Sequence, residues 1–291
     1  MGIADELKQS FKSGNTLIKL LYINIAVFLA VKIIGVIFFL LSAEQTFSIA
    51  NWLAVPADFS NLILKPWTIF TYMFLHVDFF HILFNMLWLY WFGVLFLSYF
   101  DEKKLLSLYL TGGLAGAALY ILAFNIFPAF SEVLPVSFAL GASASVIAIV
   151  IAVSVHAPDH TIHLLFLGPV KLKYIALVTI AIDILSIASS NAGGHIAHLG
   201  GALYGYLFVQ QYKKGKNINK GFDRFMDKLF SLFKPKPKFK VTYKRPMTDI
   251  EYNKEKIKKQ KDVDQILDKI AKSGYDSLTK KEKEILFKNS N

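Results

Sequence analysis

The sequence predicts an all-α membrane protein, a bundle of six transmembrane helices followed by a short soluble C-terminal helical hairpin. Hydrophobic residues make up 54% of the 291 residues and aromatic residues 15%, which is unusually apolar for a soluble chain of this length. Several apolar runs approach the roughly 20 residues that cross a hydrocarbon core. Basic residues are concentrated at the C-terminal end. These three observations together favour a polytopic membrane protein with a polar tail.

The six spans are expected near residues 18–41, 80–98, 104–126, 141–155, 172–189 and 195–212. An even number of spans puts both termini on one side of the membrane, and a Lys-rich tail makes that side cytoplasmic. The first loop, 42–79, is long and contains Trp and Phe residues that suit an amphipathic segment along the outer leaflet.

The polar parts of the chain complete the predicted domain organisation. Residues 1–17 are polar and charged, so we expect a cytoplasmic N-terminal segment rather than a cleavable signal peptide. The segment 18–212 forms the six-helix domain, and 213–245 is a basic linker with a possible surface helix. Residues 246–291 show two helical stretches separated by "SGYDS", with Ser277 or Thr279 as the cap of the second. They predict a cytoplasmic helical module.

Charge is divided sharply between the two parts. Residues 213–291 hold 23 of the 32 Lys and Arg but 11 of the 21 Asp and Glu, a net charge of +12, whereas residues 1–212 have a net charge of −1. Nucleic-acid binding is one interpretation of such a tail. Cytoplasmic retention with contact to anionic lipids of the bilayer is the interpretation we favour, with no nucleic-acid partner. The lack of cysteine excludes disulfides, thiolate catalysis and cysteine-ligated metals.

Hydrogen-bonding and ionisable side chains inside membrane spans are costly, so each is a candidate functional residue. Those within the predicted spans are Lys32, His81, Asn85, Ser143, Ser145, Asp183 and His198. Three local patterns contain most of them, and each pattern also has a purely structural interpretation.

The first pattern is "GASAS" at 141–145. Gly141 and Ala142 leave space around Ser143, and a serine at a helix start lies among free amide groups that stabilise an oxyanion. The alternative is a small-residue contact between helices in which Ser143 only caps its own helix.

The second pattern is "GGHIAHLGGALYG" at 193–205. Gly201 and Gly205 form a GxxxG face for close helix packing, and His198 lies one turn before Gly201. That placement predicts an imidazole held against a small-residue segment such as 141–145. His195 is expected nearer the outer surface, in solvent.

The third pattern is "HILFN" at 81–85. His81 and Asn85 are four residues apart and therefore share a helix face, where two neutral donors form an oxyanion hole. The alternative is an interhelical polar pair that ties spans together.

Together these motifs resemble the rhomboid family of intramembrane serine proteases, over roughly residues 15–212. "PWT" before "FTYMFLH" in the first loop is also similar to that family, and the C-terminal hairpin looks like a small module appended to some bacterial rhomboids. The resemblance implies that Ser143 is the nucleophile and His198 the general base and acid. It implies that His81 and Asn85 are oxyanion donors, assisted by the Ser143 amide, and that no cofactor or metal takes part.

Three positions depart from the family pattern. Ala144 replaces a common glycine, Ile147 replaces a common aromatic that stacks on the histidine, and Thr68 replaces the arginine of a Trp-Arg pair. None of them belongs to the implied Ser–His dyad. The family's dyad works without a carboxylate. Asp183 is the one residue that could be a third catalytic member, and the alternative is a polar tie between helices. We expect the tie.

The resemblance implies an intramembrane serine endopeptidase that cleaves single-span membrane proteins near the outer face through an acyl-enzyme. It also implies a multi-pass protein of the bacterial inner membrane with both termini cytoplasmic. One alternative is a non-proteolytic rhomboid-like protein that binds membrane clients. A transporter fits less well, because no internal repeat is visible and only Lys32 and Asp183 are charged within the spans. The run "HAPDHTIH" at 156–163 suggests a metal site, but we expect an ordinary polar loop that binds no metal.

Overall fold

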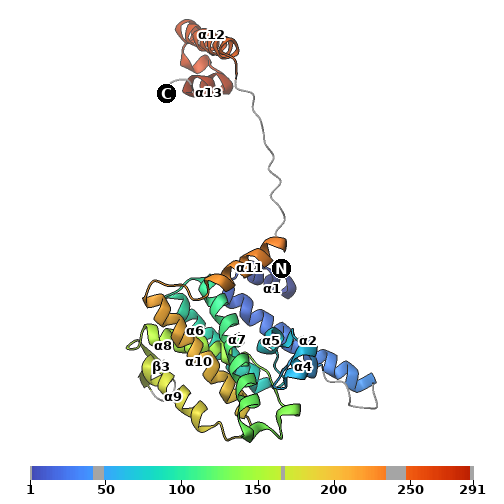
Figure 1. Cartoon of the computed structure of the whole chain (residues 1–291). Helices are drawn as coiled ribbons and strands as arrows, with labels where there is room; N and C mark the ends of the chain where they lie inside the picture. The colour runs from blue at the N-terminus through green and yellow to red at the C-terminus, as the bar shows by residue number, and fades with distance from the viewer. Residues whose placement is uncertain (1, 42–48, 165–167, 234–246, 289–291) are drawn as a thin grey trace. The chain divides into compact units, whose positions relative to one another are not determined.

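The computed structural model describes residues 2–41, 49–164, 168–233 and 247–288. Over these ranges the chain is mostly helical (Figure 1), and the strands form two small two-stranded sheets. It divides into two compact units, Met1–Phe233 and Lys234–Asn291, and each is described by itself.

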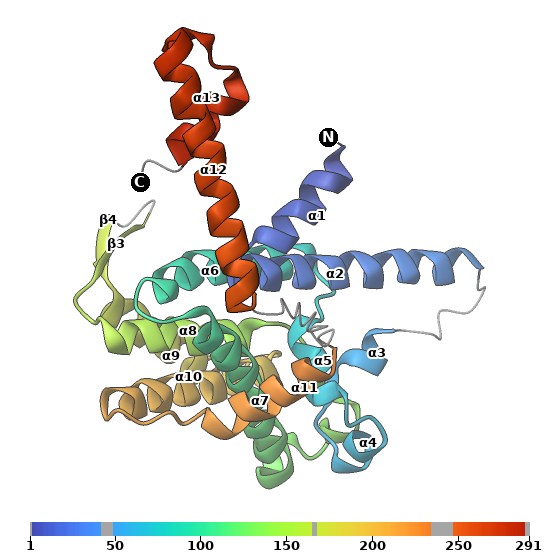
Figure 2. The same ribbon diagram turned by 90° about the horizontal axis from the view of Figure 1, so that it is seen from above.

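The first unit contains the apolar helices. Its longer helices are α1 (Ile3–Ser13), α2 (Thr16–Leu41), α6 (Phe79–Leu97), α7 (Glu102–Ile126), α8 (Ser143–His156), α9 (Leu172–Leu185), α10 (Ala192–Lys213) and α11 (Lys220–Phe233) (Figures 1 and 2). By length and composition, α2, α6 and α7 are able to cross a membrane. The apolar helix α8 has 14 residues, as does α9. The expected fifth span is shorter than predicted, because the helix ends at Leu185 before the small polar run "SIASSN".

The first loop, which was expected to be amphipathic, consists of short elements in its described part. They are α3 (Ala50–Leu53), β1 (Val55–Pro56), α4 (Phe59–Leu64), α5 (Thr68–Thr71) and the 3₁₀ turn η1 (Tyr72–Phe74), while residues 42–48 lie outside the described residues. The indole N–H of Trp67 donates to the Trp52 carbonyl at 2.8 Å, and the two rings stack. The loop is therefore folded on itself by its own aromatic residues.

The described residues contain two antiparallel strand pairings, one between distant segments and one within a hairpin. Strand β1 pairs with β2 (Phe138–Ala139), with Val55 opposite Ala139, so the first loop is bonded to the segment that enters α8. The connection from α7 to β2 contains the turns η2 (Pro128–Phe130) and η3 (Leu134–Val136). Strand β3 (Thr161–Leu164) pairs with β4 (Gly168–Lys171) in a hairpin between α8 and α9.

Helix α8 lies at the centre of the unit and is packed closely by α7 and α10. Small residues allow this packing. A Cβ on Gly205 of α10 would lie 2.3 Å from the Ala148 carbonyl oxygen, and one on Gly112 of α7 would lie 2.4 Å from the Ala148 Cβ. The GxxxG face predicted on α10 is therefore in contact with α8, whereas the matching glycines of α7 were not predicted.

The segment after α10 is pinned to the bundle by a buried asparagine. The Asn219 amide donates to the Ser107 hydroxyl at 2.7 Å, and the Tyr204 hydroxyl donates to its Oδ1 at 2.5 Å. Helix α11 follows, and Lys103 forms an ion pair with Asp227 at 2.6 Å. The helix predicted in the basic linker is present, and residues 234–246 lie outside the described part of the chain.

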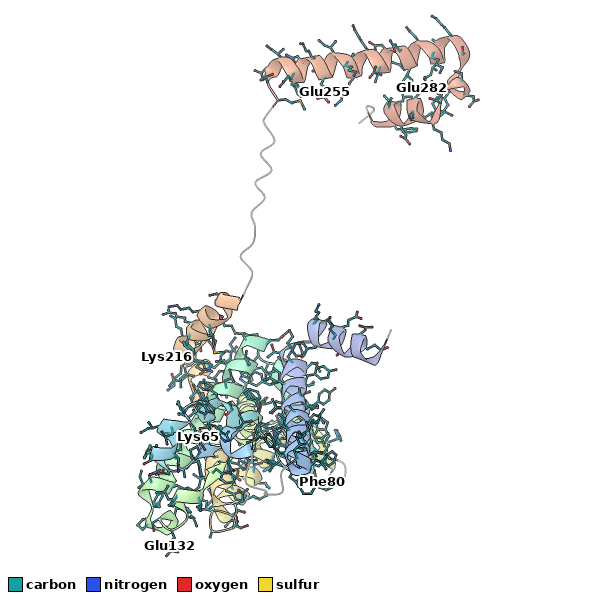
Figure 3. All side chains as sticks on the ribbon, turned by 90° about the vertical axis from the view of Figure 1, so that its right-hand side faces the viewer. Lys65, Phe80, Glu132, Lys216, Glu255 and Glu282 are labelled. Carbon is teal, nitrogen blue, oxygen red and sulfur yellow. The ribbon has the colours of Figure 1, made fainter. Side chains whose placement is uncertain are left out.

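The second unit consists of α12 (Asp249–Ser273), the turn η4 (Tyr275–Ser277) and α13 (Lys280–Lys288). Figure 3 labels Glu255 on α12 and Glu282 on α13. Gly274, with φ of +77°, ends α12 at the predicted break. Thr279 precedes α13, and its N–H and hydroxyl donate to the Glu282 carboxylate at 2.7 and 2.8 Å. Thr279 is thus the cap, one of the two candidates expected from the sequence.

Candidate active site

The turn before α8 requires a glycine and is held in place on both sides. Gly141 has φ of +115°, a region that residues with a Cβ rarely occupy. Its N–H donates to the Tyr72 carbonyl at 2.9 Å, and the next amide, of Ala142, donates to Nε2 of the buried His76 at 3.3 Å. A Cβ on Gly141 would lie 2.6 Å from Cε1 of His81, so the turn lies directly against that imidazole.

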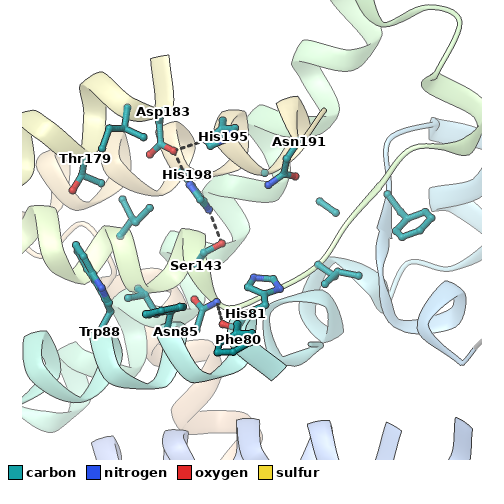
Figure 4. A pocket seen from close by; sticks show the side chains of 18 residues that line it. Phe80, His81, Asn85, Trp88, Ser143, Thr179, Asp183, Asn191, His195 and His198 are labelled. Carbon is teal, nitrogen blue, oxygen red and sulfur yellow. Dashed lines mark hydrogen bonds and ion pairs between the residues drawn. The ribbon is translucent and has the colours of Figure 1, made fainter. Parts of the chain in front are cut away.

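Ser143 is the first residue of α8, and its hydroxyl meets a histidine. The first amide groups of a helix have no partner within the helix and carry its positive dipole end, so Ser143 stands among potential anion donors. Its Oγ lies 2.7 Å from Nε2 of His198 (Figure 4). The structure therefore brings these two predicted residues into hydrogen-bond contact from separate helices.

The close packing of α10 on α8 explains this contact. A Cβ on Gly201 would lie 2.1 Å from the Ala144 carbonyl oxygen, which means that the two backbones touch. His198 lies one helical turn earlier on the same face, opposite the start of α8. A glycine at 201 thus sets the depth at which the imidazole reaches Ser143.

A carboxylate on α9 extends the contact beyond the serine and histidine. Oδ1 of Asp183 lies 2.8 Å from Nδ1 of His198 and 2.8 Å from Nδ1 of His195 (Figure 4). The Asp183 side chain is 5% exposed and that of His195 is 19% exposed. The expectation that His195 is solvated is wrong, because α10 turns this residue toward α9 and not outward. Asp183 does tie helices, as expected, but one of its partners is His198.

His81 and Asn85 line the same cavity as Ser143, from α6. The helix begins with Asp78, whose side chain accepts the His81 N–H at 3.0 Å and thereby fixes the first turn. One amide hydrogen of Asn85 is used by the His81 carbonyl, since Nδ2 donates to that oxygen at 2.9 Å. An amide carries two hydrogens, so this bond leaves one of them unused.

The cavity has a volume of about 670 Å³ and contains both polar and apolar walls. Its polar groups come from α6, α8, α9 and α10. Its apolar walls include Phe80, Phe84, Trp88, Phe138, Ile147 and Ile182. Ile147 therefore lines the site with an aliphatic side chain, at the position where the family commonly has an aromatic ring. The cavity is thus suited to a peptide segment with apolar side chains, whose backbone atoms would face Ser143.

Asp183, His195 and His198 also offer three potential metal-ligand atoms within 4.8 Å of one another. The two nitrogen–oxygen separations of 2.8 Å are hydrogen-bond lengths. Ligands about 2.0–2.1 Å from one tetrahedral metal lie farther apart than this, so the geometry fits shared protons better than an ion. In the loop "HAPDHTIH", Asp159 pairs with Lys171 and Lys173, and these cations hold the pKa of its carboxyl below the usual range.

Sequence reasoning missed His76 and gave no contact role to His195. His76 precedes His81 by five residues in "FLHVDFFH", which places it just before the helix and not on its face. It is fully buried and accepts the Ala142 amide, so it positions the turn that presents Ser143. A histidine adjacent to a predicted site motif was the available signal.

The fold and the site define a class of protein: a bundle of apolar helices with a Ser–His contact at the start of its central helix. The chain belongs to the rhomboid family, since residues 64–213 match the rhomboid domain. RHOMBOID-like protein 12, mitochondrial, from Arabidopsis thaliana is 32% identical over 182 residues, covering 60% of this chain and 54% of that protein. The chain thus spans about half the length of this curated relative. Residues 248–291 match a family of unknown function (DUF6576).

Proposed function

We propose that this protein is an intramembrane serine endopeptidase in which Ser143 is the nucleophile and His198 the general base. The observation that carries the proposal is the 2.7 Å separation between Ser143 Oγ and His198 Nε2, inside a cavity of about 670 Å³. A serine hydroxyl is a weak nucleophile unless a base within hydrogen-bond reach takes its proton. Membership of the rhomboid family supports the same conclusion.

In the proposed mechanism, Ser143 Oγ attacks the scissile carbonyl while its proton passes to Nε2 of His198. The oxyanion that forms is stabilised by the amide at the start of α8 together with His81 and Asn85, which line the same cavity. His198 then gives the proton to the leaving amine, which departs and leaves an acyl-enzyme. Water hydrolyses that ester with His198 again as base, and Ser143 is regenerated.

We propose that α2, α6, α7, α8, α9 and α10 are the six membrane spans. A helix of 14 residues, such as α8, is about 21 Å long, shorter than the ~30 Å hydrocarbon core. Its burial among other helices supports a start at membrane depth, where irregular backbone is tolerated only inside protein or a wet cavity. The basic residues after α10 favour a cytoplasmic side for both termini and contact with anionic lipids.

The proposed substrates are single-span membrane proteins with small or helix-breaking residues near the outer end of the span. A peptide bond within a helix is hydrogen-bonded and shielded, so cleavage requires local unwinding where water is present. The aromatic and aliphatic walls of the cavity suit apolar side chains of such a segment, and its polar groups suit the exposed backbone.

Cleavage of a reporter transmembrane substrate by purified protein in detergent tests the proposal. We expect Ser143→Ala and His198→Ala to abolish cleavage, while Ser145→Ala only weakens it. Ser145 is a matched control, because it is a buried serine of the same helix whose hydroxyl has no hydrogen-bond partner among the described residues. Full activity of Ser143→Ala with loss in Ser145→Ala would overturn the assignment of the nucleophile.

A further inference from the structure

We propose that Asp183 is a positioning residue for His198, so that the site works as a Ser143–His198–Asp183 triad whose carboxylate is shared with His195. This inference rests on the proposed function and extends it, because a serine–histidine dyad requires no carboxylate. It concerns how the imidazole is oriented and charged, and not which residue attacks the substrate.

The three groups form a continuous chain of hydrogen bonds. Ser143 Oγ lies 2.7 Å from Nε2 of His198, and Nδ1 of the same ring lies 2.8 Å from Oδ1 of Asp183. An ionised carboxylate only accepts hydrogen bonds, so Nδ1 carries the hydrogen and Nε2 presents its lone pair to the serine. That tautomer is the one a general base needs.

The location of Asp183 on α9 is unfavourable unless nearby donors compensate its charge. It lies two residues before the C-terminal end of the helix, where the helix dipole disfavours negative charge, and the rest of the helix is largely apolar. Its side chain is 5% exposed, and a buried charge is costly unless donors surround it. The two imidazole N–H groups at 2.8 Å supply those donors.

A simple tie between helices would be satisfied by His195 alone. His195 and His198 both lie on α10, so either bond to Asp183 joins α9 to α10. Only the bond to His198 is continuous with Ser143. The two roles are therefore separable by substitution: loss of His195 leaves the bond to His198, whereas Asp183→Asn removes the negative charge from both contacts.

The charge that His198 carries during turnover is the reason why loss of the Asp183 carboxylate should slow cleavage. When Nε2 takes the serine proton, the ring becomes an imidazolium whose positive charge the nearby carboxylate stabilises, while Asp183 itself stays ionised. The titratable groups that face His198 are Asp183 from α9, His195 from α10 and His81 from α6, with the Ser143 hydroxyl from α8. Nδ1 of His195 shares the same carboxylate oxygen, Oδ1 of Asp183.

The test compares wild type, Asp183→Asn and His195→Ala as full-length proteins in detergent, with kcat, KM and the pH profile of cleavage. We expect Asp183→Asn to lower kcat by about 10²-fold or more with little change in KM. The acid limb of its profile should move to lower pH, because the imidazolium loses its anion. His195→Ala should keep kcat within about tenfold and move that limb to higher pH. A kcat for Asp183→Asn within threefold of wild type, with an unshifted profile, would overturn the inference.

A measurement that does not need activity separates this inference from the proposed function. In ¹⁵N-histidine NMR spectra at neutral pH, the His198 ring of wild type should be protonated at Nδ1, and Asp183→Asn should lose that preference. Protonation at Nε2 in wild type would contradict the inference even in an active protease. If wild type cleaves no reporter although Nδ1 is protonated, the proposed function is refuted. The hydrogen-bonded triad would then be present but not catalytic.

Discussion

The backbone of Gly201 touches the backbone of Ala144, since a Cβ on this glycine would lie 2.1 Å from the Ala144 carbonyl oxygen. The contact joins α10 to α8 one turn from the hydrogen bond between Ser143 and His198. Helix packing and the geometry of the site are therefore set by the same pair of residues. Close backbone approach of this kind is what small residues provide between apolar helices.

Gly201→Ala tests that relationship. The added methyl group meets backbone that has no space to yield, so we expect a lower melting temperature and a loss of reporter cleavage, with a destabilisation of about 1–3 kcal/mol from overpacking. Gly221→Ala in α11 is the matched control, because no heavy atom lies within 4 Å of its Cβ position. Thermal melting in detergent measures the stability of both variants. Equal stability of the two variants would mean that α8 and α10 are not held this closely.

Gly141→Ala separates backbone strain from contact with His81. Any Cβ at φ of +115° is strained, and here it would also lie 2.6 Å from the imidazole. We expect cleavage to fall by about 10²-fold or more because the ring is displaced from the cavity. Gly215→Ala is the control, since it has φ of +70° with nothing within 4 Å and should keep turnover. Similar turnover in both variants would mean that cleavage does not depend on the contact between Gly141 and His81.

His81→Ala and Asn85→Ala test the oxyanion donors one at a time. Each substitution removes a side-chain donor from the cavity wall, so we expect kcat to fall by about 10²-fold while protein yield and melting change little. His163→Ala, on the exposed strand residue of β3, serves as the control and should match wild type. An unchanged kcat in either variant would remove that residue from the oxyanion hole.

The C-terminal module offers a pH test outside the apolar helices. The Thr279 backbone N–H, the Lys269 ammonium and the Thr279 hydroxyl bind the Glu282 carboxylate and lower its pKa from 4.5 to about 2. A depressed carboxyl pKa stabilises the fold above the unfolded value, so this stability is present above pH 4.5 and is lost as the pH falls toward 2. We expect the melting temperature of segment 246–291, followed by circular dichroism, to drop over that range.

Glu282→Gln should flatten this pH dependence, because the amide does not titrate. Glu284→Gln, at an exposed position of the same helix, should leave the dependence as in wild type. A pH dependence that persists in Glu282→Gln would assign the effect to other carboxyl groups of the module.

The sequence predicted the parts of the site that depend on local spacing. Ser143 in "GASAS", His198 one turn before Gly201, and the pair His81 and Asn85 all follow from residues close together in the chain. Their meeting in one cavity agrees with the packing expected for small residues. The family to which the chain belongs was also predicted correctly from these motifs.

The contacts of Asp183 were beyond such reasoning. It lies 12 residues before His195 and 15 before His198, and the face that α9 turns to α10 depends on tertiary packing. An almost wholly apolar helix has no hydrophobic stripe from which that rotation could be derived. The short helices of the first loop likewise depend on tertiary contacts, such as that between Trp52 and Trp67.

The central claim is that the hydroxyl of Ser143 is activated by His198, and covalent labelling measures it most directly. We predict that a fluorophosphonate added to the full-length protein in detergent forms one adduct, which peptide mass spectrometry places on Ser143 and which His198→Ala prevents. An adduct on Ser145, or equal labelling of Ser143 with and without His198, would contradict the account.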